Sequence, residues 1–175
     1  MKRHHIDAAM VTVLVLLAAG AVLHSASGGE QVSVVLVSVV LSIATIIVSS
    51  VLIGYRRYTQ RAVLSALIAP AVCLSLIVSV ALTHWPLRFG YAWSRDAFDA
   101  LAQRVRVGEH IAVPVRVGLF TIRRAELSPQ SIVCLWTYPH PGGSTGFVQC
   151  GRDYVPFNLW SLIRLDDRWQ FISED

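Results

Sequence analysis

Three long runs without a charged residue occupy most of the chain before Trp85, and no other feature limits the possible folds as strongly. The runs cover 8–23, 32–54 and 62–85. A helix that crosses a bilayer needs about 20 mostly apolar residues, and it satisfies its own backbone polar groups. The sequence therefore predicts a membrane protein with three transmembrane α-helices, at about 8–23, 32–54 and 62–85.

The first run is short for a membrane span, and a secretory signal peptide is the alternative interpretation. Lys2 and Arg3 give it a basic start, and small residues follow the apolar stretch at 25–27. Asp7 argues against a signal peptide, because it lies where such peptides are basic. The sequence leaves cleavage of this segment open, and the threading of the remaining chain is the same in either case.

The distribution of basic residues predicts the orientation of the helices. The N-terminus is basic and the loop at 55–61 carries three arginines, whereas the loop at 24–31 has neither Lys nor Arg. Because basic loops stay in the cytoplasm, we expect residues 86–175 to form an extracytoplasmic domain of a multi-pass inner or plasma membrane protein. Aromatic residues that we expect at the membrane interface are Trp85, Tyr91 and Trp93.

The net charge of +4 does not indicate a nucleic-acid partner. Charged residues make up only 15% of the chain, against about 25% in soluble domains. Residues 84–175 carry ten arginines and nine acidic residues, a net charge of +1 without a basic stripe. A DNA- or RNA-binding domain normally presents a basic face. Nucleic acid is therefore excluded, and the lipid bilayer is the expected environment of residues 1–85.

Small and hydroxyl residues recur at helical spacing in the second and third runs. This spacing places each set on one helix face, where small side chains allow helices to pack closely in lipid. The alternative is a polar path through the bundle, but the runs hold no Asp, Glu, Lys or Arg of the kind that marks ion or proton routes. The two sets are Ser38, Ser42, Thr45 and Ser49, and Ala62, Ala66, Ala69 and Cys73.

An amphipathic helix is predicted early in residues 86–175. Phe98, Leu101, Ala102 and Val105 fall at the spacing of one helix face. Ser94 is the expected N-cap of this helix. Gly108 is expected to end it, because glycine commonly occupies the left-handed position after a helix.

The apolar period changes to two beyond Glu109, which predicts strands. Alternating segments occur at 113–122 and 132–138, a further segment at 147–150, and a hairpin is predicted from 162–165 and 169–172. Strands and one helix in a short region favour a small α+β domain with an antiparallel sheet.

The pattern G-G-S-T-G around Ser144 matches the nucleophile elbow of serine hydrolases. In those enzymes the serine lies between a strand and a helix, whereas here both flanks are strand-like. His140 is the last histidine of the chain, so no histidine follows Ser144. We therefore interpret this segment as a hairpin turn.

The same hairpin predicts a disulfide. If its centre is Gly142, Cys134 lies opposite Cys150 and Trp136 lies opposite Val148. Opposed residues in an antiparallel pair are close enough for a strained disulfide, and an extracytoplasmic location permits oxidation. The alternative is two buried free thiols.

Other site chemistry is absent from the sequence. The six histidines have no metal-ligand spacing, and no phosphate-binding or dinucleotide-binding glycine motif occurs. The acidic residues near the C-terminus, Asp166, Asp167, Glu174 and Asp175, are interpreted as a solvated face. Trp136, Trp160 and Trp169 could line a groove, but core positions are expected. We predict no catalytic residue, no cofactor and no metal site.

Three segments, PLRFGYAWSRDAFDALAQ, RVGLFTI and LWSLIRLDDRWQFISED, resemble those of small uncharacterised membrane proteins from high-GC bacteria. Such proteins join a few N-terminal transmembrane helices to a short extracytoplasmic domain. The resemblance covers residues 86–175 and implies no activity.

These observations predict a non-catalytic membrane protein whose outward domain mediates protein interaction, as an accessory subunit or partner-binding module. The partner would be another membrane or envelope protein. The alternative is a small transporter or sensor component that uses the helical bundle itself.

Overall fold

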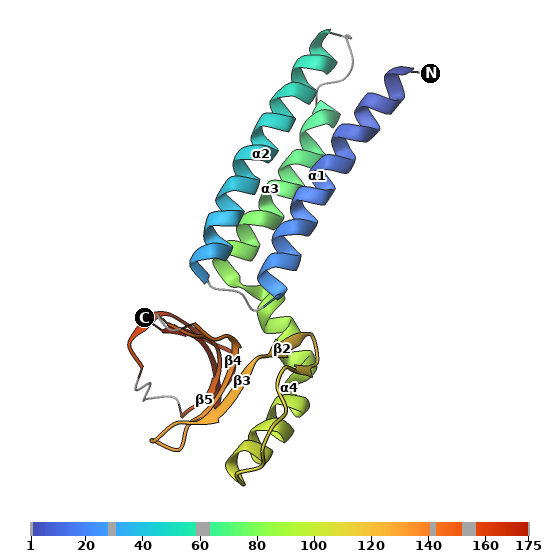
Figure 1. Ribbon diagram of the computed structural model, residues 1–175. Helices are drawn as coiled ribbons and strands as arrows, with labels where there is room; N and C mark the ends of the chain where they lie inside the picture. Colours follow the sequence, from blue (N-terminus) through green and yellow to red (C-terminus); the bar gives the residue numbers. More distant parts are fainter. Residues whose placement is uncertain (1, 28–30, 59–63, 141–142, 152–156, 175) are drawn as a thin grey trace. The chain divides into compact units, whose positions relative to one another are not determined.

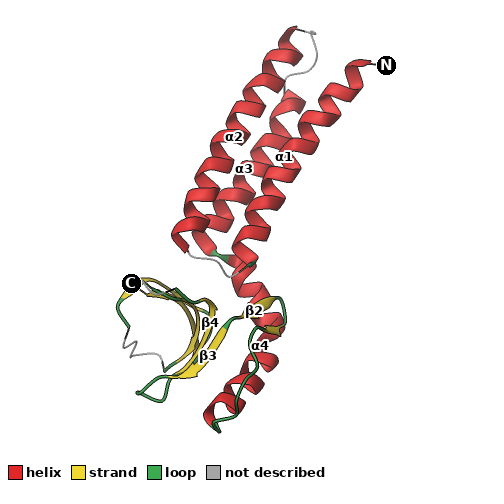
Figure 2. Cartoon of the chain, viewed as in Figure 1, coloured by secondary structure: helices red, strands yellow, loops and turns green. Residues whose placement is uncertain are grey.

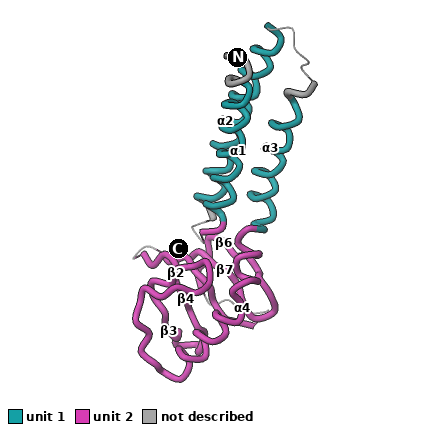
Figure 3. The backbone as a smooth tube through the Cα atoms, turned by 90° about the vertical axis from the view of Figure 1, so that its right-hand side faces the viewer, with its two compact units in different colours: residues 1–25, 32–85 teal, residues 26–31, 86–175 magenta. Residues whose placement is uncertain are grey.

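The computed structural model describes the chain except for residues 1, 28–30, 59–63, 141–142, 152–156 and 175. The chain divides into two compact units (Figure 3), which are described separately. The N-terminal unit holds residues 1–25 and 32–85, and the C-terminal unit holds residues 26–31 and 86–175.

The described residues of the N-terminal unit form three long helices (Figure 1). They are α1 (Lys2–Ala26), α2 (Gln31–Tyr58) and α3 (Leu64–Thr83). Within them, Asp7–Ala26 and Ser33–Tyr58 are long and apolar enough to cross a membrane, and α3 meets the same criterion together with the next helix. The structure thus has two to three candidate spans near the N-terminus, as a multi-pass membrane protein requires.

Small and hydroxyl side chains lie inside this bundle. Ser38 and Thr45 of α2 are buried, and the Thr45 hydroxyl donates to the Leu41 carbonyl at 2.8 Å. On α3, Cys73 is buried with Leu14, Ala18, Ala21 and Ile77, while Ala62 lies outside the described residues. The predicted packing stripe of α2 therefore faces the interior, and large apolar side chains such as Leu36 and Ile46 point outward.

Helix α4 (Trp85–Arg106) begins nine residues before the predicted N-cap. Pro86 suits the first turn, because its missing N–H would have no helical partner there. Ser94 is therefore inside the helix and buried, and the N-cap prediction is wrong. Gly108 ends the helix as predicted: its N–H donates to the Val105 carbonyl, and the Glu109 N–H to the Arg104 carbonyl. This is the bond pattern of a Schellman motif.

A two-stranded hairpin follows, where one alternating segment was expected. It consists of β1 (Val115–Val117) and β2 (Phe120–Ile122), with Val117 opposite Phe120. Gly118 turns the chain with a φ of 58°, and a Cβ on it would lie 1.7 Å from the Ser94 hydroxyl. Only glycine fits this contact between the turn and α4.

The main sheet of the C-terminal unit is antiparallel and five-stranded (Figure 2), which confirms the predicted α+β class. The strand order is β3-β4-β5-β7-β6. The predicted hairpin is present as β6 and β7. The strands are β3 (Arg124–Leu127), β4 (Val133–Tyr138), β5 (Thr145–Gln149), β6 (Leu159–Arg164) and β7 (Trp169–Glu174).

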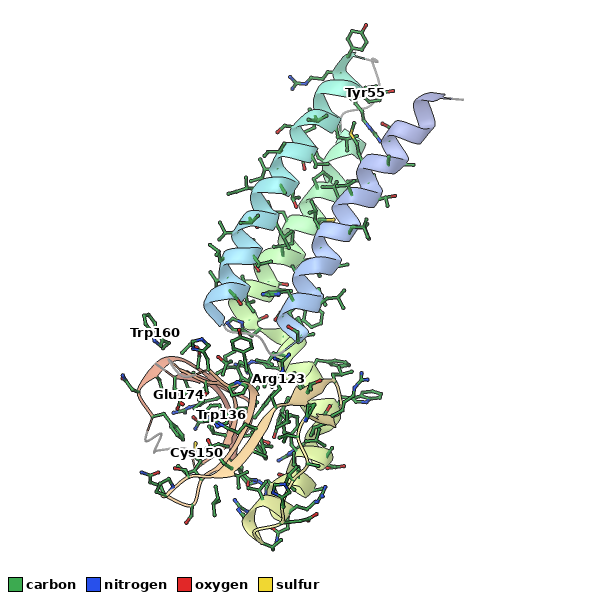
Figure 4. All side chains as sticks on the ribbon, viewed as in Figure 1. Tyr55, Arg123, Trp136, Cys150, Trp160 and Glu174 are labelled. Carbon is green, nitrogen blue, oxygen red and sulfur yellow. The ribbon has the colours of Figure 1, made fainter. Side chains whose placement is uncertain are left out.

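The two faces of this sheet carry different side chains. One face packs on α4 through a cluster of aromatic rings. In this cluster the centroid of the Phe98 ring lies 4.4 Å from that of Phe147 and 5.5 Å from that of Trp169. The other face, which is the concave side of the curved sheet in Figures 1 and 4, holds a second cluster with Trp136 and Cys150.

Polar contacts also fasten α4 to β7 and to the turn before it. The Asp99 carboxylate accepts hydrogen bonds from the Trp169 indole at 2.9 Å and the Arg168 guanidinium at 2.8 Å. The Tyr91 hydroxyl donates to Asp166 at 2.6 Å, and Arg95 lies 3.1 Å from the same carboxylate. Tyr91 is thus buried in the domain core rather than placed at a membrane interface, which corrects its predicted position.

Candidate functional site

The C-terminal unit has a groove at the free edge of its sheet. It has a volume of about 440 Å³. Its walls are the end of α4, the segment that follows it and the edge strand β3. Leu127 and Val113 are exposed apolar side chains in this lining. The remaining lining residues are Val105, Gly108, Glu109, His110, Ile111, Arg124, Ala125 and Glu126.

The backbone of β3 offers hydrogen-bonding groups toward this edge. Among the described strands, only β4 pairs with β3. The Ser128 N–H donates to the Ile132 carbonyl at 2.8 Å, which fixes the alternation of the antiparallel ladder. In this alternation the backbone N–H and C=O groups of Arg124 and Glu126 face β4, as those of Ser128 do. The N–H and C=O groups of Ala125 and Leu127 therefore point outward, away from β4. An extended peptide could therefore add to this edge.

Charged side chains in the groove already have partners within the domain. Arg104 donates to both carboxylate oxygens of Glu109, at 2.9 and 2.6 Å. Hydrogen bonding from Arg104 lowers the pKa of Glu109, so this carboxylate stays ionised. Arg124 lies 3.3 Å from Glu126, and both side chains project from β3 toward the concave face, where Trp136 lies. The groove does not require a charged ligand.

A polar cluster lies on the concave face next to β3, and it contains residues that the sequence did not single out. The Trp136 indole donates to Glu126 at 2.6 Å, and the guanidinium carbon of Arg124 lies 5.7 Å from the Trp136 ring. Burial raises the pKa of Glu174 at this face, Arg124 opposes the shift, and Glu126 adds to it. Arg124 and Glu126 lie on one face of β3, and Trp136 lies on the same face of β4. The sequence could have indicated this shared face only if the position and register of β3 were known.

Ser144 lies in a strand–turn–strand segment, as predicted. It directly precedes β5 and is buried, and its hydroxyl accepts a hydrogen bond from Arg124 at 3.2 Å. Its carbonyl accepts from the Glu174 N–H at 2.9 Å. Ser144 therefore anchors the hairpin to its neighbours, while the predicted centre at Gly142 lies outside the described residues.

The hairpin register on which the disulfide prediction depended is wrong. Cys134 lies opposite Val148, and Trp136 lies opposite Gly146, two residues away from the expected pairing. Gly146 permits this register, because a Cβ there would lie 2.4 Å from the Leu135 carbonyl oxygen, so only glycine allows this close approach of β5 to β4. The pairing of β4 with β5 then shifts by one residue between Trp136 and Tyr138, so that Tyr138 lies opposite Thr145.

Cys134 and Cys150 are free thiols in this structure, buried in one cluster on the concave face. Burial raises the pKa of Cys134 to about 12, with further contributions from Glu126 and Glu174. A thiol with such a pKa is a poor nucleophile at neutral pH. Oxidation of the pair stays a prediction, which alkylation of the unfolded protein before and after reduction tests.

The acidic residues near the C-terminus are not simply a solvated face. Asp166 accepts hydrogen bonds from the backbone N–H groups of Arg168 and Trp169, at 2.8 and 2.7 Å. Burial of Asp166 acts to raise its pKa, but these bonds, the Tyr91 hydroxyl and Arg95 hold the pKa below its usual value. Asp166 thereby forms the β6–β7 turn without a glycine.

Of the three tryptophans considered as groove residues, Trp136 and Trp169 are core residues, and Trp160 is 66% exposed on β6. Within the described part of the chain, no group of three or more His, Cys, Asp or Glu residues could hold a metal ion.

Comparison with protein-family models, with curated proteins and with solved structures finds no match.

Proposed function

We propose that the chain is a membrane-anchored, non-catalytic interaction protein. Its C-terminal unit, on the extracytoplasmic side, binds an extended segment of another membrane or envelope protein along the outer edge of β3. One observation carries the proposal: the outward backbone groups of Ala125 and Leu127 lie at an open groove of about 440 Å³.

The lining of the groove favours an uncharged, partly apolar segment as the occupant. Glu109 and Glu126 are already paired with arginines of this domain. Leu127 is 44% exposed and Val113 is equally exposed, so both can cover an apolar side chain of the ligand. Backbone hydrogen bonds supply affinity in strand addition, and side-chain pockets supply selectivity.

Substitution of Leu127 tests this proposal. Leu127→Pro removes the outward N–H of β3 and leaves the bonds from β3 to β4 intact, while Leu127→Val keeps the donor as a matched control. The full-length chain is purified from gently solubilised membranes, and the co-eluting proteins are identified and quantified. We expect wild type and Leu127→Val to retain the same partner, and Leu127→Pro to lose about tenfold in binding, the equivalent of ~1.4 kcal/mol.

Two results would overturn the proposal. One is a wild-type chain that purifies without any partner, and the other is equal retention of the partner by Leu127→Pro and Leu127→Val. A thermal unfolding curve of each variant shows whether the domain is folded. The orientation is tested independently by a topology reporter fused after the last residue, which should be active outside the cytoplasm.

A further inference from the structure

The first half of α4 presents an aromatic surface that its own domain does not cover. Phe89 is 61% exposed and Trp93 is 78% exposed. Their rings are neighbours, with centroids 6.3 Å apart, as expected for positions four residues apart on a helix. Two large aromatic side chains side by side in water form an apolar patch, and such patches mark binding sites.

The opposite face of the same helix is already occupied. Leu87, Tyr91 and Phe98 are buried in the core of the C-terminal unit. Gly90 lies against the hairpin between β1 and β2, where a Cβ would be 3.0 Å from Phe120 and 3.5 Å from Leu119. Leu119 is itself exposed, so it adds an apolar side chain beside this part of α4.

The character of the exposed face changes along the helix. Phe89 and Trp93 occupy it in the first half, whereas no large apolar side chain is exposed on it further along. The exposed residues of this face beyond Trp93 are Asp96, Ala97, Ala100, Gln103 and Arg104. A helix that faces water throughout would be polar over its whole length. The change between Trp93 and Asp96 instead indicates two environments for one helix face.

The short connection between α3 and α4 indicates what surrounds Phe89 and Trp93. Only His84 separates the apolar helix α3 from α4. At 1.5 Å per residue, Phe89 and Trp93 lie roughly 6 and 12 Å along the helix from Trp85. The polar zone on each side of the hydrocarbon core is about 5–7 Å thick. Phe89 is within reach of this zone for any direction of α4, and Trp93 is within reach when α4 runs obliquely to the membrane normal or along the surface.

We propose that the face of α4 formed by Phe89 and Trp93 rests in the interfacial layer of the bilayer. The aromatic rings lie at the boundary between lipid headgroups and acyl chains, a position that tryptophan favours. Arg88, exposed on the same half of the helix, contacts lipid phosphates. The C-terminal unit is thus held at the membrane surface by a lipid contact as well as by its connection to α3.

Tryptophan fluorescence of the full-length chain in lipid nanodiscs tests this inference. The variants are Trp93→Phe and, as a matched control, Trp160→Phe, which removes another exposed tryptophan on β6. The difference between the emission of wild type and that of a variant gives the emission of the one indole removed. The quenching of this emission is measured with lipids brominated near the headgroup and with aqueous iodide. We expect the Trp93 emission to be quenched by brominated lipid and protected from iodide, and the Trp160 emission to behave in the opposite way.

A second pair of variants tests the boundary along the helix. In the Trp93→Phe background, Phe89→Trp should restore a lipid-quenched emission, because Phe89 lies on the same exposed surface. Ala100→Trp in the same background places an indole on the same face beyond Asp96, and its emission should be quenched by iodide instead. Circular dichroism confirms that all variants are folded.

Three outcomes would overturn the inference. The first is iodide quenching of Trp93 as strong as that of Trp160. The second is protection of Trp93 from iodide without any quenching by brominated lipid, which would assign the surface to a protein partner. The third is protection that occurs only in discs with two chains, which would assign it to a second copy.

Discussion

The two units of the chain distribute apolar and polar side chains in opposite ways. In the N-terminal unit, Leu36, Ile46 and Ile47 are exposed, while Ser38 and Thr45 are buried. In the C-terminal unit, rings such as Phe98, Phe147 and Trp169 are fully buried, and arginines and carboxylates lie outside. One chain thus contains a domain that places its apolar side chains in a core and a bundle that presents them to its surroundings.

The difference shows how each unit gains its stability. Water drives the aromatic rings of the C-terminal unit together, because apolar area leaves the solvent. In lipid no such force acts between helices, and the bundle depends on close packing of small residues and on hydrogen bonds of hydroxyls to the preceding turn. A substitution should therefore act differently in the two units, which the following experiments test.

Removal of a buried ring should give the largest contrast. Phe98→Ala leaves a cavity between Phe120, Phe147 and Trp169, so we expect the free energy of unfolding to fall by about 3–5 kcal/mol. Leu36→Ala, on the exposed surface of α2, should change it by less than about 0.5 kcal/mol. Denaturation of nanodisc-embedded protein, followed by near-ultraviolet circular dichroism, measures both. Equal losses would contradict the proposed contrast.

Introduction of a charge should give the reverse contrast. Ile46 is exposed near the middle of the candidate span Ser33–Tyr58, and Ile46→Arg should cost about 2.5–3.5 kcal/mol of insertion free energy. Thr121→Arg, on the exposed side of β2, should be nearly neutral. Glycosylation mapping of membrane insertion gives the first value, and thermal unfolding gives the second. Efficient insertion of Ile46→Arg would show that this side of α2 does not face lipid.

Glycine substitutions should differ in sign between the units. Gly146→Ala places a Cβ 2.4 Å from a backbone oxygen that cannot move aside, so we expect a loss of about 1–3 kcal/mol or more. Gly54→Ala in α2 meets no atom within 4 Å, so the higher helix propensity of alanine should add up to about 1 kcal/mol. Unfolding curves of the two variants measure the signs. A neutral Gly146→Ala would refute the close approach of β5 to β4.

Acid should weaken the C-terminal unit through Asp166, and this is the smallest of the expected effects. Burial opposes the shift, but the contacts from Tyr91, two backbone N–H groups and Arg95 lower the pKa of Asp166 in the folded state. Its contribution is therefore present above the unfolded pKa of about 3.9 and is lost as the pH falls through the folded value. Asp166→Asn should flatten the acid limb of the stability curve.

Glu174 provides a control of the opposite sign. Burial raises its pKa in the folded state, so its contribution is present below the unfolded pKa of about 4.3 and is lost as the pH rises through the folded value. Glu174→Gln should therefore be more stable than wild type at neutral pH. Thermal melts between pH 3 and pH 7 (roughly the range of carboxylate titration) compare the two variants. If the stability of both variants changed with pH in parallel with that of wild type, the roles assigned to Asp166 and Glu174 would be wrong.

Local patterns predicted the parts of the fold that depend on neighbouring residues. The uncharged runs located the long helices, Gly108 located the end of α4, and the apolar alternation located the β6–β7 hairpin. The start of α4 was missed because Pro86 and the aromatic residues before Ser94 do not follow one simple apolar stripe. Tyr91 is buried whereas Phe89 and Trp93 are exposed. This difference depends on which side of α4 packs against the core of the domain, and the local sequence does not specify that side.

Features that depend on distant contacts could not be predicted. The turn at Gly118 depends on Ser94 beneath it, and the hairpin register depends on the close contact of Gly146 with β4. The candidate groove needs β3 at the sheet edge next to the segment after α4, and these lie on opposite sides of the β1–β2 hairpin in sequence. Neither spacing nor composition contains that juxtaposition.

The position of β7 determines when the C-terminal unit can fold during synthesis. Among the strands that the structure describes, β7 comes last in sequence but lies between β5 and β6 in the sheet. Until a ribosome has released residues 169–174, the nascent chain has β5 as an unpaired edge and lacks the Trp169 and Phe171 rings of the core. A chain that stops before β7 would therefore expose an aggregation-prone edge and an incomplete core, rather than form a slightly smaller domain.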